Sequence, residues 1–269
     1  MERLESQAIP VEAPPLKSDS PSEIAPFIIR PSLLSRFQDI TCALSTRKGG
    51  VSPEPYCMNT SLRVGDASDN VQENRRRFLN VLSLTPDRLA FAQQEHTANV
   101  RRISTPGTYE RCDALMSDVP GVFLSVSVAD CTPVFLFDAS CRAVACIHAG
   151  WRGTEQGIVE KTVNSMQREF GSKPEEIHAF LGPAAGQCCY EVGADVAQKF
   201  DAGLVVDRHG KRYLDIKRAN WQQLRTCGVP ENNIEVHADC TICKSHLYHS
   251  YRRDRERSGR MMGIIGINV

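Results

Sequence analysis

Two apolar segments in the middle of the chain each end on a polar, chemically active residue. GVFLSVSVAD (121–130) is rich in β-branched residues and ends on Asp130, and RAVACIHAG (142–150) places His148 two residues before its final glycine. Runs of this length and composition predict buried β-strands. Because strand ends in α/β folds present side chains to a ligand crevice, both ends are candidate parts of one functional site.

A helix is predicted after the second of these strands. Apolar residues recur at three- and four-residue spacing from Ile158 to Phe170, which is the periodicity of a helix with one buried face. Thr154 is expected to cap the N-terminus of this helix, and Gly171 followed by Pro174 to end it.

Strand and helix patterns alternate over the rest of the chain. IHAFLG (177–182) and IEVHAD (234–239) are predicted strands, and residues 217–227 form a predicted helix. We find no internal repeat and no linker-like stretch after residue 25. The pattern therefore indicates one α/β domain over residues 26–269, and it leaves the order and direction of the strands open.

The first 25 residues differ in composition from the rest. MERLESQAIPVEAPPLKSDSPSEIA is rich in Pro, Ser and Glu and shows no sustained periodicity. A segment of this composition cannot bury enough apolar surface to order itself. Residues 1–25 are therefore predicted to be a flexible tail.

Net charge and hydropathy bear on the partners of the chain. Lys and Arg number 32, as do Asp and Glu, so the formal net charge is zero. A neutral chain lacks the basic surface typical of nucleic-acid binding, and no apolar run approaches the roughly 20 residues of a membrane span. The N-terminus shows no secretory pattern. We therefore expect a cytoplasmic protein that acts on small molecules and binds neither nucleic acid nor membrane.

A single metal site is predicted from three residues that are far apart in sequence. Cys131 follows the first apolar strand and His148 ends the second, and thiolate and imidazole are ligands suited to zinc or copper. His96, in a polar run, is the best third ligand among the seven histidines. Three protein ligands with one open position are typical of catalytic zinc. The alternative is that each residue is an ordinary buried thiol or a hydrogen-bonded imidazole.

The eleven cysteines are expected to be reduced thiols, most of them small buried hydrophobes. Cys240-Thr-Ile-Cys243, with His246 and His249 close behind, has the residue types of a structural zinc site. Its spacing is too tight for a standard zinc finger, which uses two separated pairs of ligands. We therefore favour buried thiols over a second zinc site here, and we consider a thioredoxin-like redox pair the weakest interpretation.

Arginines supply a second kind of candidate binding group. Arg47 lies in TRKGG (46–50), Arg152 follows Gly150 and Trp151, and Arg253 is near Arg260. Guanidinium groups bind phosphate or carboxylate through two parallel hydrogen bonds. The alternative for each is a solvated charged surface. No GxGxxG, P-loop, GxSxG or H-x-E signature occurs, so the nucleotide-binding, hydrolase and deaminase mechanisms that use those motifs have no support.

Eight stretches of the chain form a recognisable series of motifs. They are TRKGGVS (46–52), MN (58–59), VGD (64–66), NRRRF (74–78), DALMSDVPGVFLSVSVADCTPVFLFD (113–138), HAGWRGT (148–154), LGPAAGQCCYEVG (181–193) and CTICKSHLYHSYRRDRERSGRMMGII (240–265). In this order they resemble motifs of the YfiH-like family, long labelled multicopper polyphenol oxidase (laccase) and later described as purine nucleoside phosphorylase and adenosine deaminase. The combination of HAGWRGT with ADC-x-P and SYRRD is highly specific.

The resemblance implies an α/β single domain with mixed sheets in a layered sandwich, similar to cysteine hydrolases related to the cytotoxic necrotizing factor fold. It implies a zinc site, with copper as a possible metal, at His96, Cys131 and His148. Cys131 and His148 are then also the expected catalytic residues, and Asp130 is expected to act as an acid or base or to orient a ligand. The expected substrate- and phosphate-binding residues are Arg47, Asn59, Arg152 and Arg253.

The family labels make different demands on the chain. A multicopper oxidase holds a blue copper beside a three-copper cluster and needs about ten histidines, many of them in H-x-H pairs. This chain has seven histidines and no H-x-H, so it cannot hold that cluster. The preferred prediction is a zinc-dependent purine nucleoside phosphorylase acting with phosphate on adenosine, inosine, guanosine and methylthioadenosine, with adenosine deaminase activity.

Two other activities stay open. A single bound copper would give a laccase-like polyphenol oxidoreductase. A metal-free Cys131–His148 nucleophile pair would give a hydrolase, such as one acting in peptidoglycan precursor editing, and would need Cys131 to be a thiolate of low pKa. One departure from the family pattern bears on the substrate: Thr97 stands where Q-x-H-G has glycine, and its side chain is expected to narrow the site beside His96.

Overall fold

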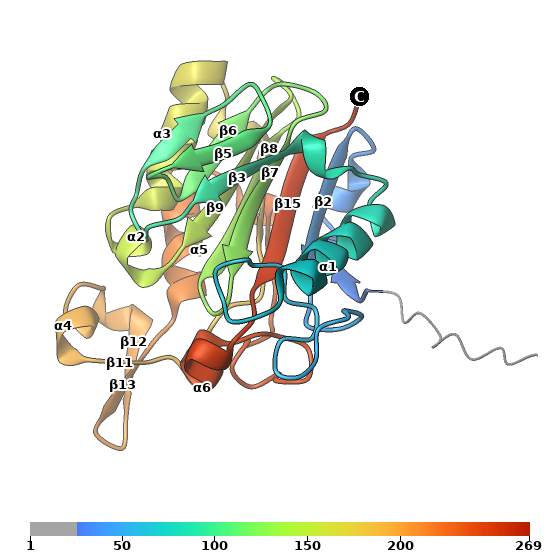
Figure 1. Cartoon of the computed structure of the whole chain (residues 1–269). Coiled ribbons are helices and arrows are strands. Elements are labelled where there is room, and N and C mark those ends of the chain that lie inside the picture. The colour runs from blue at the N-terminus through green and yellow to red at the C-terminus, as the bar shows by residue number, and fades with distance from the viewer. Residues whose placement is uncertain (1–25) are drawn as a thin grey trace, which may run out of the picture.

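Two six-stranded sheets stack face to face in the computed structural model of the chain, which describes residues 26–269 (Figure 1). Both sheets are mixed, with parallel pairs such as β3 with β7 and β4 with β6 among antiparallel ones. The first sheet, in spatial order, is β1 (Ile28–Ile29), β2 (Ile40–Ser45), β15 (Met261–Ile267), β7 (Phe123–Val128), β3 (Leu89–Gln93) and β5 (Gly107–Glu110). The second is β14 (Ile234–Val236), β10 (Ile177–Leu181), β8 (Thr132–Asp138), β9 (Ala143–Ala149), β6 (Ala114–Ser117) and β4 (Val100–Arg102).

Helices cover the outer faces of both sheets. α1 (Ser68–Val81) packs on the first sheet, and α3 (Ile158–Phe170) and α5 (Ile216–Thr226) pack on the second (Figure 1). The result is a four-layer sandwich, which confirms the predicted single α/β domain with mixed sheets. The remaining elements are α2 (Trp151–Glu155), α6 (Tyr251–Asp254), and a small unit of α4 (Ala194–Ala197) with the sheet β11 (Glu191–Val192), β13 (Lys211–Leu214) and β12 (Val205–Arg208).

Side-chain alternation along the central strands builds the layers. On β7, Leu124 and Val126 join the apolar core between the two sheets, whereas Phe123 belongs to the core beneath α1. On β9, Val144 and Cys146 join the core between the sheets, and alternate residues pack against α3 and α5. Because side chains two residues apart share a face of a strand, the sequence pattern decides which residues meet between the sheets.

The predicted elements near the site are present with small shifts. The strands over 121–130, 142–150 and 177–182 and the helix over 217–227 are confirmed, while the strand predicted over 234–239 is shorter, at Ile234–Val236. The helix from Ile158 to Phe170 is confirmed together with its left-handed Gly171 cap.

The prediction that Thr154 caps that helix is wrong. Thr154 lies inside α2 and donates its hydroxyl to Asn220, and left-handed Gly157 precedes α3. The predicted tail, residues 1–25, lies outside the described residues. Within residues 26–269, no helix is long and apolar enough to span a bilayer.

Candidate active site

A cavity of about 810 Å³ opens at the ends of β3, β7 and β9. His148 lies on the same face of β9 as Val144 and Cys146, which is the face toward the first sheet. Cys131 lies in the connection from β7 to β8, and His96 follows β3. All three side chains line the cavity, so three distant segments of the sequence meet at one end of the layer between the sheets.

The three predicted metal ligands are close enough to share one ion. The Sγ atom of Cys131 lies 3.9 Å from Nε2 of His96, and the rings of His96 and His148 meet edge to face with centroids 4.8 Å apart. One ligand atom from each of the three residues lies within 4.8 Å of the others. Sequence separation therefore did not prevent the convergence that the metal-site prediction requires.

Asp113, a residue that the sequence patterns did not single out, holds both histidines in place. Its fully buried carboxylate accepts from Nδ1 of His148 at 2.8 Å and from the backbone N–H groups of Glu95, His96 and Thr97 at 2.7–3.1 Å. The Thr97 hydroxyl also donates to it at 2.9 Å. Thr97 does not line the cavity, so the expected narrowing beside His96 is not observed: its side chain turns to Asp113 instead.

The electrostatics of the cluster favour charge separation. Burial opposes ionisation of the Cys131 thiol, but the imidazoles of His148 and His96 lower its pKa overall. Burial likewise disfavours the imidazolium of His148, but Cys131 and Asp113 raise its pKa. Burial also opposes ionisation of Asp113, and the hydrogen bonds from His148 and the neighbouring backbone lower its pKa to about 2. The cluster therefore stabilises a thiolate at Cys131.

These residues fit a tetrahedral zinc ion. Zinc takes thiolate sulfur at about 2.3 Å and imidazole nitrogen at about 2.0–2.1 Å, which places a sulfur and a nitrogen ligand about 3.5 Å apart. The Cys131–His96 separation of 3.9 Å is close to that spacing. The bond from Asp113 to Nδ1 leaves Nε2 of His148 for a metal, the arrangement of many metal-bound histidines. The donor set, two imidazoles and one thiolate, also suits copper.

Asp130 lies beside the cluster but is engaged by the backbone and by a hydroxyl. It adopts a positive φ of 88° and is buried. One carboxylate oxygen accepts from the Thr241 hydroxyl at 2.7 Å, and the other accepts from the backbone N–H of Arg252 at 2.6 Å. Backbone strain of this kind is concentrated at functional sites. The contacts indicate that Asp130 fixes the segment carrying Arg252.

The predicted substrate-binding residues divide into two groups. Arg152 lines the cavity, with its guanidinium 4.4 Å from the Trp151 ring centre. Arg47, Asn59 and Arg253 do not line it. Their polar atoms bind neighbouring loops instead. Arg47 contacts Glu54 and the Ser245 and Pro55 carbonyls, and Arg253 contacts Asp254 and the carbonyls of Thr241, Ile242 and Tyr248. Buried Asn59 contacts Ser61, Asp66 and the Arg260 N–H.

Other arginines take the places that those residues were expected to hold. Arg63, Arg75, Arg252 and Arg260 line the cavity beside Arg152. Arg75 comes from the NRRRF stretch, whose arginines were not among the predicted binding residues, and Arg252 is the neighbour of the predicted Arg253. The other lining residues that bear on binding are Phe91, Gln94, Trp151, Tyr190 and Tyr251.

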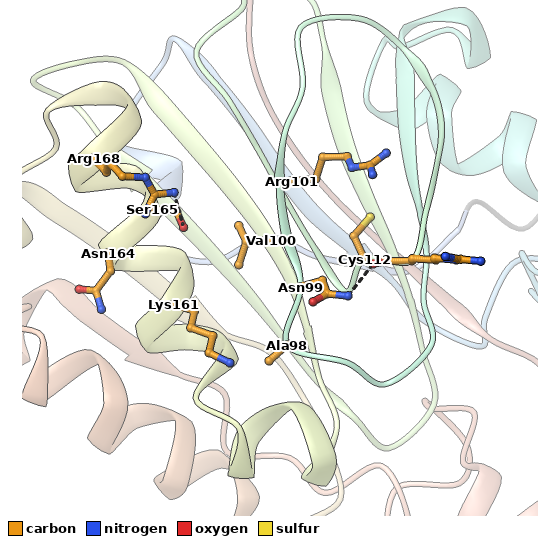
Figure 2. A pocket seen from close by; sticks show the side chains of 10 residues that line it. Ala98, Asn99, Val100, Arg101, Cys112, Lys161, Asn164, Ser165 and Arg168 are labelled. Atoms are coloured by element: carbon orange, nitrogen blue, oxygen red, sulfur yellow. Dashed lines mark hydrogen bonds between the residues drawn. The ribbon is translucent and has the colours of Figure 1, made fainter.

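A second hollow, of about 610 Å³, is lined by residues of β4 and α3 and has a different character. Figure 2 shows Arg101, Lys161 and Arg168 around it. Neither a histidine nor a carboxylate is among its described lining residues, and burial raises the pKa of its one thiol, Cys112, to about 11. The hollow therefore lacks the reactive groups that converge in the larger cavity.

Curated proteins of similar sequence share one name. The chain is 39% identical to a purine nucleoside phosphorylase of Deinococcus radiodurans over 84% of this chain and 88% of that protein. It is 37% identical to purine nucleoside phosphorylase YfiH of Escherichia coli, over 84% and 93%, and 34% identical to purine nucleoside phosphorylase YlmD of Geobacillus stearothermophilus, over 86% and 91%.

Solved structures and a family model agree with these similarities. The crystal structure of YlmD from Geobacillus stearothermophilus matches with a TM-score of 0.83 at 33% identity, over 87% of this chain and 93% of that one. The structure of the Bacillus licheniformis hypothetical protein YfiH matches with a TM-score of 0.81 at 33% identity, over 85% and 93%. The family model described as multi-copper polyphenol oxidoreductase laccase matches residues 41–268. The chain therefore belongs to the YfiH-like family.

Proposed function

We propose that this chain is a zinc-dependent purine nucleoside phosphorylase, with adenosine, inosine, guanosine and methylthioadenosine as substrates. The observation that carries the proposal is that one cavity combines the His96, Cys131 and His148 ligand set with five arginines. The name purine nucleoside phosphorylase, shared by the relatives compared above, supports the same reaction.

Arginines of the cavity are proposed to bind phosphate. Arg75 lies 5.2 Å from the Phe91 ring centre, and Arg252 lies 5.2 Å from that of Tyr190, so each guanidinium is held against an aromatic face. Nε of Arg75 donates to the Thr60 carbonyl, which leaves the terminal N–H groups of this arginine for a ligand. Planar guanidinium groups match phosphate oxygens with pairs of charge-assisted hydrogen bonds.

Aromatic residues of the same cavity are proposed to hold the purine base. Phe91, Trp151, Tyr190 and Tyr251 line it together with the amide of Gln94. Aromatic faces suit a flat heterocycle, and a few polar groups set its orientation. Both amide atoms of Gln94 are bonded to the backbone of Ser127, so this side chain stabilises the cavity wall.

Phosphorolysis transfers the sugar from the base to phosphate. The bond from C1′ to the purine nitrogen breaks with its electron pair moving to the base, and an oxygen of hydrogen phosphate forms a new bond to C1′. The proton that hydrogen phosphate loses on becoming the ester is taken up by the purine nitrogen. The arginines would hold the phosphate dianion against C1′, which removes the entropic cost of the encounter and stabilises the cation-like sugar carbon. A zinc ion on His96, Cys131 and His148 would supply a Lewis acid in the same cavity. Asp130 is proposed to position Arg252.

Two further activities have an observation in their favour. Adenosine deamination is proposed as a second activity because three protein ligands leave the fourth position of a tetrahedral ion open. A metal-free hydrolase is the competing function, because the lowered pKa of Cys131 and the raised pKa of His148 describe a thiolate–imidazolium pair.

Assays with and without phosphate and metal separate these reactions. We expect release of adenine from adenosine and of hypoxanthine from inosine to require phosphate and to be lost after chelation of zinc. Inosine formed from adenosine without phosphate would establish the deaminase. Hydrolysis that survives chelation and is lost in Cys131→Ser would replace the phosphorylase by the thiol hydrolase, and polyphenol oxidation dependent on added copper would replace it by the oxidoreductase.

A further inference from the structure

Four cysteines outside the active site form a second cluster. Cys188 and Cys189 follow β10, and Cys240 and Cys243 follow β14. The Sγ atom of Cys243 lies 3.4 Å from that of Cys188 and 3.2 Å from that of Cys189. All four sulfur atoms lie within 4.8 Å of one another. Cys188 and Cys189 thus provide the second, separated cysteine pair that the motif at Cys240 lacks in sequence and that a structural zinc site needs.

His246 and His249, which follow the motif in sequence, are not part of this cluster. His249 is fully buried elsewhere, in contact with the Gly259 region. The expectation of buried thiols also fails for part of the motif, because Cys240 is buried but Cys243 is exposed, as is Cys188 beside it. Exposed thiols gathered at one point are not explained by hydrophobic packing.

The backbone around the cluster is organised for close approach of the two segments. Ala184 pairs with Cys240 in a parallel bridge, and the N–H of Thr241 donates to the Ala184 carbonyl at 3.0 Å. The N–H of Gly186 donates to Sγ of Cys240 at 3.2 Å. A Cβ at Gly186 would lie 3.0 Å from Cβ of Cys240 and 3.2 Å from Sγ of Cys188, so a larger residue would push the two cysteines apart by a few tenths of an ångström.

The spacing of the sulfur atoms favours a metal over disulfides. Zinc–sulfur bonds of 2.3 Å in a tetrahedron place sulfur ligands about 3.8 Å apart, whereas a disulfide requires about 2.05 Å. Cys243 approaches Cys188 and Cys189 almost equally and could bond to only one of them.

Cations flank the four thiols. Arg208 donates to the carbonyls of Gln187 and Cys188, and buried Lys217 donates to the carbonyls of His237 and Asp239 near Cys240. A zinc ion with four thiolates carries a net negative charge, which these cations would offset.

We propose that Cys188, Cys189, Cys240 and Cys243 form a tetrathiolate zinc site with a structural role, separate from the His-Cys-His site. A site with four protein ligands is closed to substrate. The zinc clamps together two segments that reach Asp130, through the N–H of Ala185 at 2.9 Å and the hydroxyl of Thr241 at 2.7 Å. The first of these segments continues to Tyr190 in the cavity wall. The structural zinc thus fixes the wall of the active site.

Metal content and zinc X-ray absorption of the full chain, purified without oxygen, test this proposal. We expect two zinc ions per chain in the wild type, one for each cluster. A His96→Ala/Cys131→Ser variant removes the active-site ligands and should keep one zinc, surrounded by sulfur alone at about 2.3 Å. Adding Cys188→Ser/Cys243→Ser should remove this zinc, whereas adding Cys227→Ser, a cysteine outside both clusters, should not.

Zinc X-ray absorption of the His96→Ala/Cys131→Ser variant shows whether the remaining zinc is bound by sulfur alone. This result tests the four-cysteine site even if the variants of the second cluster fail to fold. A folded variant, as judged by circular dichroism, that holds no zinc would overturn the proposal. Nitrogen or oxygen ligands around the remaining zinc would also overturn it. So would a disulfide among the four cysteines, detected by mass spectrometry after alkylation of the anaerobically purified chain.

Discussion

Asp113 is the residue whose side chain touches both histidine segments of the candidate site. It accepts one bond from the His148 ring and four bonds from residues 95–97. His96 adopts a positive φ of 60°, a conformation that a non-glycine residue keeps only when its surroundings impose it. The carboxylate therefore determines both the ring orientation of His148 and the backbone conformation at His96.

Asp113→Asn should lower zinc affinity and kcat/KM together, by about 10- to 100-fold. The amide has one acceptor oxygen, and its NH₂ group would face N–H donors of residues 95–97. Zinc affinity is measured by competition with a chromophoric chelator. Asp118→Asn, which alters an exposed ion pair with Arg102, is the matched control. Unchanged zinc affinity in Asp113→Asn would contradict the positioning role.

His249 should make the fold sensitive to mild acid. Burial disfavours its charged form, and Arg47, Arg260 and Arg253 add to the effect, so that its pKa falls to about 3 from the ordinary 6.5. As pH falls, the unfolded chain takes up the proton at His249 before the folded chain does. The free energy of unfolding therefore keeps its full contribution from neutral His249 above pH 6.5 and loses it progressively between pH 6.5 and pH 3. The slope approaches about 1.4 kcal/mol per pH unit.

Urea unfolding of His249→Phe between pH 7 and pH 4 tests this sign. The variant keeps an aromatic ring without a titrating group, so its unfolding free energy should fall less steeply with acid than that of the wild type. His246→Phe, at an exposed histidine, should follow the wild type. Parallel slopes for all three proteins would show that His249 does not carry the acid sensitivity.

At the scale of the elements, the start of α2 limits the room beside Cys131 and His96, two of the proposed metal ligands. Gly150 is the residue before α2, and a Cβ there would lie 3.0 Å from Sγ of Cys131 and 3.0 Å from Cδ2 of His96. The glycine of HAGWRGT therefore allows the helix start to lie close to Cys131 and His96.

Gly150→Ala should displace Cys131 and His96 by a few tenths of an ångström and lower kcat/KM by about tenfold or more, since small misplacements of reacting groups carry large costs. Steady-state kinetics with saturating zinc measure the effect. Gly203→Ala places a Cβ in open space and should leave kcat/KM unchanged. Equal kcat/KM values for the two variants would rule out the steric limit at α2.

The elements show where sequence patterns suffice. α3 has the periodicity of one buried face, and β7 and β9 have β-branched or apolar runs, so local composition alone predicts them. The predicted Thr154 cap is wrong because Thr154 already lies in α2, and left-handed Gly157 separates α2 from α3. The pairing of β15 with β2 joins residues more than 200 positions apart, which no local pattern specifies.

At the scale of the whole molecule, the candidate active site depends on the contact between two sheets. Phe135 is fully buried in the core between them, and its ring lies against Gly263 of β15 in the other sheet. Phe135→Ala should lower the unfolding free energy by about 3–5 kcal/mol. Phe27→Ala, at a side chain that is 54% exposed, should change it by less than about 0.5 kcal/mol. Similar unfolding free energies for the two variants in chemical denaturation would contradict this assignment of the core.

The same long-range packing explains how much of the candidate site could be predicted from the sequence. That His96, Cys131 and His148 meet in one cavity was predictable because their side-chain chemistry is rare and they lie at or just past the ends of apolar strands. Arg47 and Arg253 were misplaced relative to the cavity because an arginine's direction depends on the loop carbonyls around it. The Cys188–Cys189 pair meets Cys240 and Cys243 through long-range contacts, the pairing of β10 with β14 and the bridge between Ala184 and Cys240, which no local pattern specifies.

Phosphorus NMR during turnover of inosine tests the central claim most directly. With zinc-loaded wild-type chain and inorganic phosphate, we predict that the phosphate resonance falls as one sugar 1-phosphate resonance grows, in step with the release of hypoxanthine. Cys131→Ser, examined at equal concentration, should give neither change. Hypoxanthine release without a sugar phosphate, or equal turnover by Cys131→Ser, would contradict phosphorolysis at the site formed by His96, Cys131 and His148.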